Sequence, residues 1–144
     1  MPHDELLRML GTTGDPEQDL STNGDGTARF AGKYKTYIGV ARVGGDVTGT
    51  SPSLVLTVNE SANGTSSFSN VATFAAITDE QVGHVASTAP NYAVPGDDPL
   101  LVSFTTSKDY VRVSWTMTGT TPVFNDVSVE LKPVATAAFR RSGI

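Results

Sequence analysis

Apolar and polar residues alternate along the stretch from Asp109 to Lys132. Before the central Thr118–Pro122 segment, one side of the alternation carries Val111, Val113, Trp115 and Met117. After it, Val127, Val129 and Leu131 form a second apolar row. A period of two with β-branched and aromatic residues is typical of strands that have one buried face. The pattern therefore predicts a hairpin over 109–132, with the only tryptophan on its buried side.

Further alternating stretches predict strands near residues 27–30, 36–43, 53–61, 68–74 and 100–105. Asn63-Gly64 favours a tight turn, because both residue types tolerate positive φ, so 53–61 and 68–74 form a second predicted hairpin. The stretch Leu100–Thr105 has apolar residues on both faces, which predicts a strand that lies either inside a sheet or under the long loop before it. About seven strands with frequent turns indicate an all-β fold, an antiparallel β-sandwich. A jelly-roll connection is preferred, and an immunoglobulin-like order stays open.

A short motif occurs twice along the chain. Thr48-Gly49-Thr50-Ser51-Pro52 precedes one predicted strand, and Thr118-Gly119-Thr120-Thr121-Pro122 precedes another. Proline has no backbone N–H, so it is tolerated where a ladder is interrupted. The repeat predicts two similar hairpins, one in each of two packed sheets.

The two ends of the chain differ in composition from the body at 26–132. Residues 1–25 are predicted to form an extended arm, with a short helix over Asp4–Leu10 that places Leu6, Leu7 and Leu10 on one side. An extended arm of about 24 residues reaches about 80 Å, which is far enough to contact neighbouring subunits. Residues 133–144 are predicted to form a short tail, in which Phe139, Arg140 and Arg141 are candidate contacts.

Composition excludes several functional classes. The chain has 144 residues, which suits one domain, and its formal net charge of −5 argues against nucleic-acid binding. It has no cysteine, which excludes disulfides and thiolate metal sites. No apolar run approaches ~20 residues, and the first residues lack the pattern of a signal peptide, so we expect no membrane association.

No arrangement of residues in the sequence predicts catalysis. The two histidines are His3 and His84, and the spacing of His84 from Asp79 and Glu80 matches no known zinc or calcium pattern. We therefore predict no enzyme activity, no metal and no cofactor. Several aromatic residues, chiefly Tyr92, Tyr110 and Phe124, fall opposite or near the apolar rows. They predict an exposed aromatic surface for sugar or for a second subunit, unless they form part of the core.

The segment from Ser53 to Leu131 carries a series of motifs. These are a strand ending in Glu60-Ser61, the turn Asn63-Gly64-Thr65, a returning strand, Tyr110-Val111-Arg112-Val113, and Thr118-Gly119-Thr120-Thr121-Pro122. The series resembles the pattern of jelly-roll head decoration (cement) proteins of tailed bacteriophages. The resemblance implies a non-enzymatic protein, made in the host cytoplasm, that sits on the capsid surface of the virion. It implies a homo-oligomer, in first place a homotrimer, whose partner is the major capsid protein. The alternatives are a carbohydrate-binding module, and a neck or tail component.

Overall fold

The computed structural model describes residues 7–8, 17–31, 36–78 and 100–134, and every structural statement below concerns these residues. Their regular elements are all strands: β1 (Leu7–Arg8), β2 (Gln18–Leu20), β3 (Gly24–Asp25), β4 (Arg29–Phe30), β5 (Thr36–Val43), β6 (Val47–Ser61), β7 (Ser69–Thr73), β8 (Ile77–Thr78), β9 (Leu100–Thr105) and β10 (Tyr110–Pro133). All strand pairs are antiparallel. The predicted all-β, antiparallel fold is confirmed.

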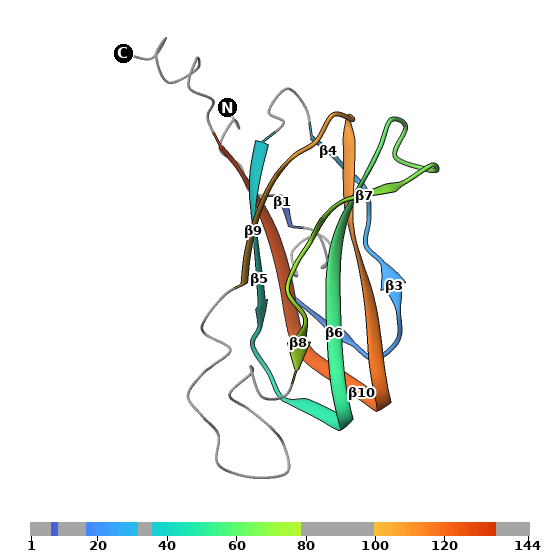
Figure 1. The fold of residues 1–144 in the computed structure, drawn as a ribbon, viewed down its shortest axis with the longest axis vertical. Coiled ribbons are helices and arrows are strands. Elements are labelled where there is room, and N and C mark those ends of the chain that lie inside the picture. Colours follow the sequence, from blue (N-terminus) through green and yellow to red (C-terminus); the bar gives the residue numbers. More distant parts are fainter. Residues whose placement is uncertain (1–6, 9–16, 32–35, 79–99, 135–144) are drawn as a thin grey trace.

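The sheet is organised around β10, the longest strand (Figure 1). The first part of β10, from Tyr110 to Phe124, pairs with β6, and its last part, from Val127 to Pro133, pairs with β5. The main strand order is therefore β7-β6-β10-β5-β9. The sheet folds over along β10, and its two halves enclose the core (Figure 1). The jelly-roll connection stays a prediction.

The hairpin predicted over 109–132 is wrong, because its two halves pair with β5 and β6 rather than with each other. The two copies of the repeated motif lie side by side on β6 and β10, with Thr50 opposite Thr120 at their centre. Gly49 and Gly119 have φ of 111° and 112°, and Ser51 and Thr121 have φ of 49° and 48°. The register shifts on both sides of the Thr50–Thr120 pair, so each copy is a β-bulge rather than a turn. The prediction of two separate hairpins from the repeat is therefore wrong. The two copies of the motif form one pair of bulges that face each other.

The predicted buried faces are confirmed along β5, β6 and β10. The core contains the apolar rows of these strands: Tyr37, Ala41, Val43, Leu54, Leu56, Val58, Val111, Val113, Trp115, Met117, Val127, Val129 and Leu131. Among the described residues β9 is the last strand in the order, so the expected position inside a sheet is wrong. The loop that was the alternative cover of this strand lies outside the described residues. Phe104 faces the core, whereas the side chain of Leu101 is 64% exposed.

The predicted hairpin over 53–61 and 68–74 is confirmed by the pairing of β6 with β7. Its turn is held by side chains: Asn63 Oδ1 accepts hydrogen bonds from the backbone N–H groups of Thr65 and Ser66, both at 2.9 Å. Ser61 Oγ accepts a further bond from the N–H of Gly64 at 3.1 Å. Gly64 has φ of 77°, the conformation that the Asn-Gly pair predicted.

Much of the predicted arm belongs to the sheet. Strands β1 to β4 pair with β10 in chain order, from Leu7 opposite Leu131 to Phe30 opposite Tyr110. The helix expected over Asp4–Leu10 is wrong at Leu7–Arg8, because these residues pair with the open edge of β10 instead. Leu20 is only 2% exposed, so it is a core residue. We call residues Glu17–Ala31 the strap, because they run along the edge of β10.

Candidate functional site

The strap is fastened to β10 by side chains as well as by short strands. Asn23 Oδ1 accepts a hydrogen bond from the N–H of Met117 at 2.7 Å, and Asp19 Oδ1 accepts one from the N–H of Asp126 at 2.9 Å. Trp115 Nε1 donates to the carbonyl of Thr22 at 2.8 Å. These bonds satisfy backbone and indole groups at places where the strap leaves regular pairing.

Gly24 allows the strap to lie directly on the tryptophan ring. A Cβ atom at this position would lie 2.8 Å from Cζ2 of Trp115, closer than side chains approach one another. The backbone of β3 therefore covers the indole, and Trp115 is buried although it lies opposite a glycine at the sheet edge. The sequence Asn23-Gly24-Asp25-Gly26 thus serves close packing between the strap and β10.

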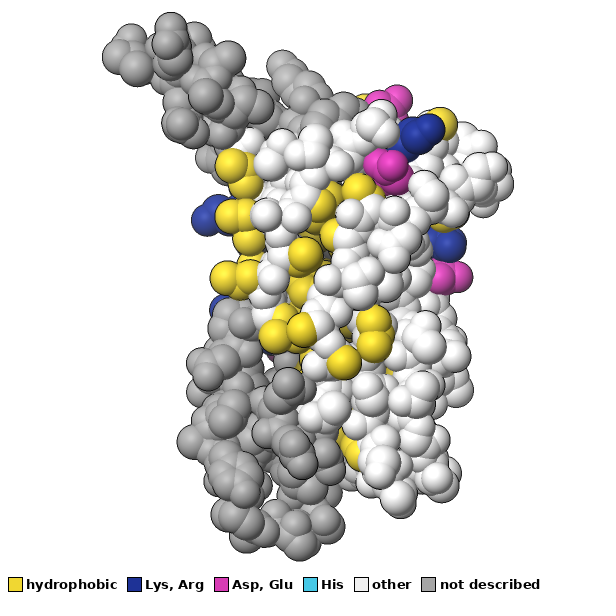
Figure 2. Space-filling view, in the orientation of Figure 1, with side chains coloured by type: hydrophobic (Ala, Val, Ile, Leu, Met, Phe, Trp, Pro, Cys, Tyr) yellow, Lys and Arg dark blue, Asp and Glu magenta, His cyan; other side chains and the backbone are white. Residues whose placement is uncertain are grey.

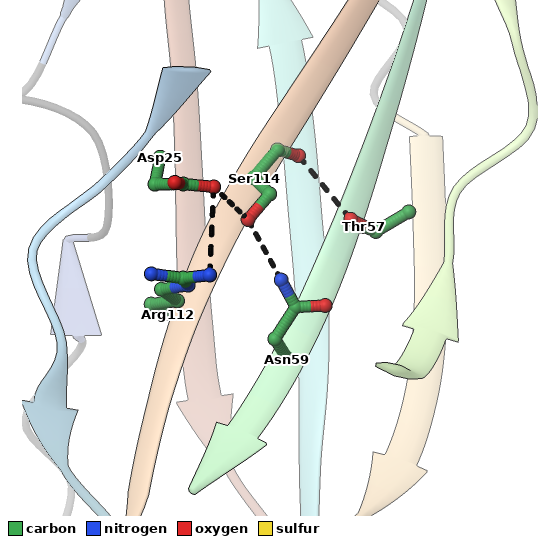
Figure 3. Close-up of polar contacts among 5 residues, drawn as sticks. All are labelled: Asp25, Thr57, Asn59, Arg112 and Ser114. Atoms are coloured by element: carbon green, nitrogen blue, oxygen red, sulfur yellow. Dashed lines mark hydrogen bonds and ion pairs between the residues drawn. The ribbon is translucent and has the colours of Figure 1, made fainter. Parts of the chain in front are cut away.

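The outer face of the same strands carries a polar cluster (Figure 3). Ser114 Oγ donates to Asp25 Oδ1 at 2.6 Å and accepts from Asn59 Nδ2 at 2.7 Å. Asp25 also lies 3.6 Å from the guanidinium of Arg112, and Thr57 Oγ1 donates to the carbonyl of Ser114 at 3.4 Å. The cluster links the strap, β10 and β6 in one row of hydrogen bonds.

Arg112 also packs on an aromatic ring next to the cluster. Its guanidinium carbon lies 3.7 Å from the centroid of the Phe68 ring, a cation–π contact. Farther along β10, the ring of Tyr110 meets Phe30 edge-on with centroids 5.5 Å apart, and it covers Gly64. The turn between β6 and β7 and the end of the strap are therefore joined through the ring of Tyr110 on β10.

The end of the strap is anchored inside the molecule. The hydroxyl of Tyr37 donates a hydrogen bond of 2.7 Å to the carbonyl of Ala31, and the ring stacks on Phe104. Burial raises the pKa of the Tyr37 hydroxyl above its usual value, because the charged phenolate would lose its hydration.

The hydroxyl of Ser114 stands at the centre of the polar cluster. It donates to a carboxylate that also faces Arg112, and it accepts from an amide. Within the described ranges, no group of three or more His, Cys, Asp or Glu side chains could hold a metal ion. No helix in the part of the chain that the structure describes is long and apolar enough to cross a membrane.

Of the sequence-predicted site residues, the structure describes Leu7, Tyr110 and Phe124. Phe124 is fully buried, so its predicted place on an exposed aromatic surface is wrong. Tyr110 is half-buried against Phe30 and Gly64. Of the three leucines predicted as arm contacts, Leu7 is the one that the structure describes, and it pairs with Leu131. The remaining predicted contacts lie outside the described residues: Leu6, Leu10, Tyr92, Phe139, Arg140 and Arg141.

Exposed apolar side chains lie mainly on the half of the sheet that contains β5 and β9. Among the described residues, Leu101 on β9, Phe30 on β4 and Ile38 on β5 are the exposed large hydrophobic side chains, and Leu101 is the most exposed. Leu100 and Val102 of β9 and Val71 and Ala72 of β7 pack partly buried on the core. Figure 2 shows hydrophobic side chains gathered over β9 and between it and the β7–β8 side. The doubly apolar pattern of Leu100–Thr105 was the sequence signal for this surface.

Comparison of the chain with protein-family models, with curated proteins and with solved structures finds no match.

Proposed function

We propose that this chain is a non-enzymatic structural protein of a tailed-bacteriophage virion, a decoration (cement) protein on the outside of the head. The observation that carries the proposal is the motif series between Ser53 and Leu131, which resembles that of phage decoration proteins. These motifs occupy framework positions: the β6–β7 turn and the paired bulges of β6 and β10. Part of the motif series meets in space, which supports the proposal: Tyr110 covers Gly64 of the turn, and Tyr110–Val113 pairs with the strand that ends in Glu60-Ser61.

The use of polar groups supports a structural role. Asp19, Asn23 and Asp25 make hydrogen bonds that hold the strap on β10, and Glu60 Oε1 accepts bonds from Thr106 and Ser107. Side chains of these types would supply acid–base chemistry in an enzyme. Here they satisfy backbone and hydroxyl groups between strands, which favours a rigid building block.

The proposed mechanism is burial of surface in many repeated contacts. A specific protein interface buries about 1,600 Å² in total, and repetition over a capsid lattice strengthens individually weak contacts by avidity. The partners are the major capsid protein and further copies of the chain, with the homotrimer implied by the resemblance. The residues before the strap are the contact arm in this proposal, and the C-terminal tail is a second contact. No cofactor takes part.

The proposal is tested by adding the purified chain to heads that lack it. The full chain binds saturably, whereas a variant without residues 1–16 keeps its β-sheet circular dichroism and binds fewer copies. This cut leaves the strap in place, because removal of Leu20 would open the core. A variant with Leu6→Ser and Leu10→Ser keeps the length of the arm and serves as the matched control for lost apolar contact. Absence of binding by the full chain contradicts the decoration role, and equal binding by the shortened chain contradicts the contact arm.

A further inference from the structure

In the part of the chain that the structure describes, the outward face of β6, β7 and the first part of β10 carries few aliphatic side chains. Directly paired residues of antiparallel strands point to the same face, so the pairings of Ser114 and of its alternate neighbours define this face. Most of its positions carry hydroxyl or amide side chains: Ser53, Thr57, Asn59, Asn70, Thr73, Ser114, Thr116 and Thr118. The half-buried Val55 is the aliphatic residue among the positions on β6 and β10. Because protein–protein interfaces have an apolar centre, this face favours a ligand that is itself polar.

The charges on this face cancel each other. Its charged residues at the described strand positions are Asp25 and Arg112, whose side chains lie 3.6 Å apart. The guanidinium of Arg112 is also held on the ring of Phe68, so it is engaged by both neighbours. A face without net charge complements a neutral ligand, whereas a phosphate or another anion would need an unpaired cation.

The polar side chains at the centre of the face are fixed before any ligand binds (Figure 3). The hydroxyl of Ser114 joins the carboxylate of Asp25 to the amide of Asn59, and Asp25 in turn faces Arg112. The side chain of Asp25 is nevertheless 53% exposed, so its carboxylate is open to a ligand. Exposed polar side chains that are already ordered lose less rotamer entropy when a ligand binds. The polar cluster is therefore a preorganised set of hydrogen-bonding groups.

An exposed aromatic ring stands beside the polar cluster. Phe30 on β4 is 59% exposed, and its ring is held edge-on against Tyr110 with the two ring planes at 70°. Phe30 pairs with Tyr110, and Asp25 pairs with Ser114 on the same strand, so ring and carboxylate are about 13 Å apart along β10. A sugar ring presents a C–H face that packs on an aromatic ring, and hydroxyl groups that bond to amides and carboxylates. The face thus offers both kinds of contact within the length of a short oligosaccharide.

We propose that this face binds a neutral oligosaccharide, with one sugar ring on Phe30 and hydroxyl groups on Asp25 and Asn59. The inference goes beyond the decoration role and does not depend on it. Of the aromatic residues from which the sequence predicted a surface for sugar, Tyr110 belongs to this face, where it supports the ring of Phe30. A neutral sugar fits better than a protein partner, because the face is rich in hydroxyl and amide groups and its two charges are paired with each other.

The test is calorimetric titration of the full chain with a panel of neutral hexasaccharides of glucose, mannose, galactose and N-acetylglucosamine, and with sialylated and sulfated oligosaccharides as charged probes. At least one neutral member binds at millimolar concentration, and the charged probes bind more weakly. Variant Phe30→Ala lowers the affinity about tenfold, because the stacking ring is lost. Variant Phe30→Trp keeps the affinity, and Asp25→Ala weakens it as well. The matched control is Leu101→Ala, which removes a similarly exposed apolar side chain from the other half of the sheet and keeps the affinity.

Several results overturn the sugar site. These are no binding by any neutral member of the panel, tighter binding of the charged probes, and unchanged affinity in Phe30→Ala or Asp25→Ala when the variant keeps its β-sheet circular dichroism. An equal loss in Leu101→Ala overturns it too, because binding would then not be located on this face. The head-binding assay reports separately on the decoration role. Loss of head binding by Phe30→Ala, without sugar binding by the unchanged chain, assigns the face to a protein partner instead.

Discussion

At the scale of single residues, the fold depends on four backbone positions with positive φ in the paired bulges. Gly49 and Gly119 lie against the backbone of the opposite motif, and Ser51 and Thr121 take a left-handed conformation that costs a residue with a Cβ atom about 1–2 kcal/mol. The bulges also explain Phe124. Each extra residue moves the alternation by one position, so the buried row passes from Met117 to Phe124 and, after a further irregularity, returns to Val127.

Substitution Gly119→Ala is expected to lower the free energy of unfolding by about 2 kcal/mol or more, the scale of a strained backbone together with a steric clash. The added Cβ would lie 2.6 Å from the carbonyl oxygen of Ser51, in a residue with φ of 112°. The matched control is Gly44→Ala, whose Cβ would meet no atom closer than 3.6 Å. Urea unfolding, followed by tryptophan fluorescence, measures the free energy of unfolding of both variants. Equal midpoints for the two variants would show that the bulge pair is not needed.

The raised pKa of Tyr37 predicts that the folded chain loses stability at alkaline pH. Burial raises the pKa of its hydroxyl in the folded chain, so above the unfolded value of about 10 only the unfolded chain releases this proton. The stabilisation by the neutral Tyr37 hydroxyl is fully present below a pH of about 10. Above it, the free energy of unfolding falls by about 1.4 kcal/mol per pH unit until the pH reaches the folded pKa. Urea midpoints of the wild type and of Tyr37→Phe between pH 8 and 11 measure the difference. The urea midpoint of Tyr37→Phe is expected to fall less with pH than that of the wild type. Midpoints that fall in parallel would show that Tyr37 does not cause the loss of stability.

At the scale of elements, the strap converts an open edge of β10 into a covered one. Its strands are too short to hold by ladder bonds, and the contacts of Asp19, Asn23 and Trp115 supply the remaining fixation. One fully apolar anchor, Leu20, reaches the core opposite Phe124. The strap is therefore an integral part of the sheet, and the proposed contact arm lies before it.

Substitution Leu20→Ala tests the integral role of the strap. It is expected to lower the free energy of unfolding by about 2–5 kcal/mol, the usual result of truncating a buried leucine. Leu101→Ala is the matched control, because its side chain is 64% exposed and a surface change alters stability by about 0.5 kcal/mol or less. Urea unfolding is measured at a chain concentration low enough to keep both proteins as single copies. A Leu20 variant as stable as the control would show that the strap is detachable.

At the scale of the whole molecule, local pattern predicted the buried faces of the strands and the pairing of β6 with β7, but not the other strand partners. The rows of β5, β6 and β10 and the Asn63-Gly64 turn follow from neighbouring residues, and the sequence was sufficient for them. The continuity of β10 was not predictable in this way, because Thr118–Pro122 becomes a bulge only beside Thr48–Pro52, which is distant in the chain. The apolar pattern did not predict the strap, because the strap pairs with β10 through backbone groups and polar side chains. The place of β9 at the end of the strand order was not predictable either, because it depends on the arrangement of the other strands.

The central claim is that the chain is a decoration protein that covers a head lattice. The most direct measurement is its copy number in purified virions, by quantitative mass spectrometry with the major capsid protein as internal reference. The account predicts a fixed ratio of the two chains, which stays the same in heads separated from their tails. A few copies per particle that leave with the neck or tail, or no copies at all, would contradict it.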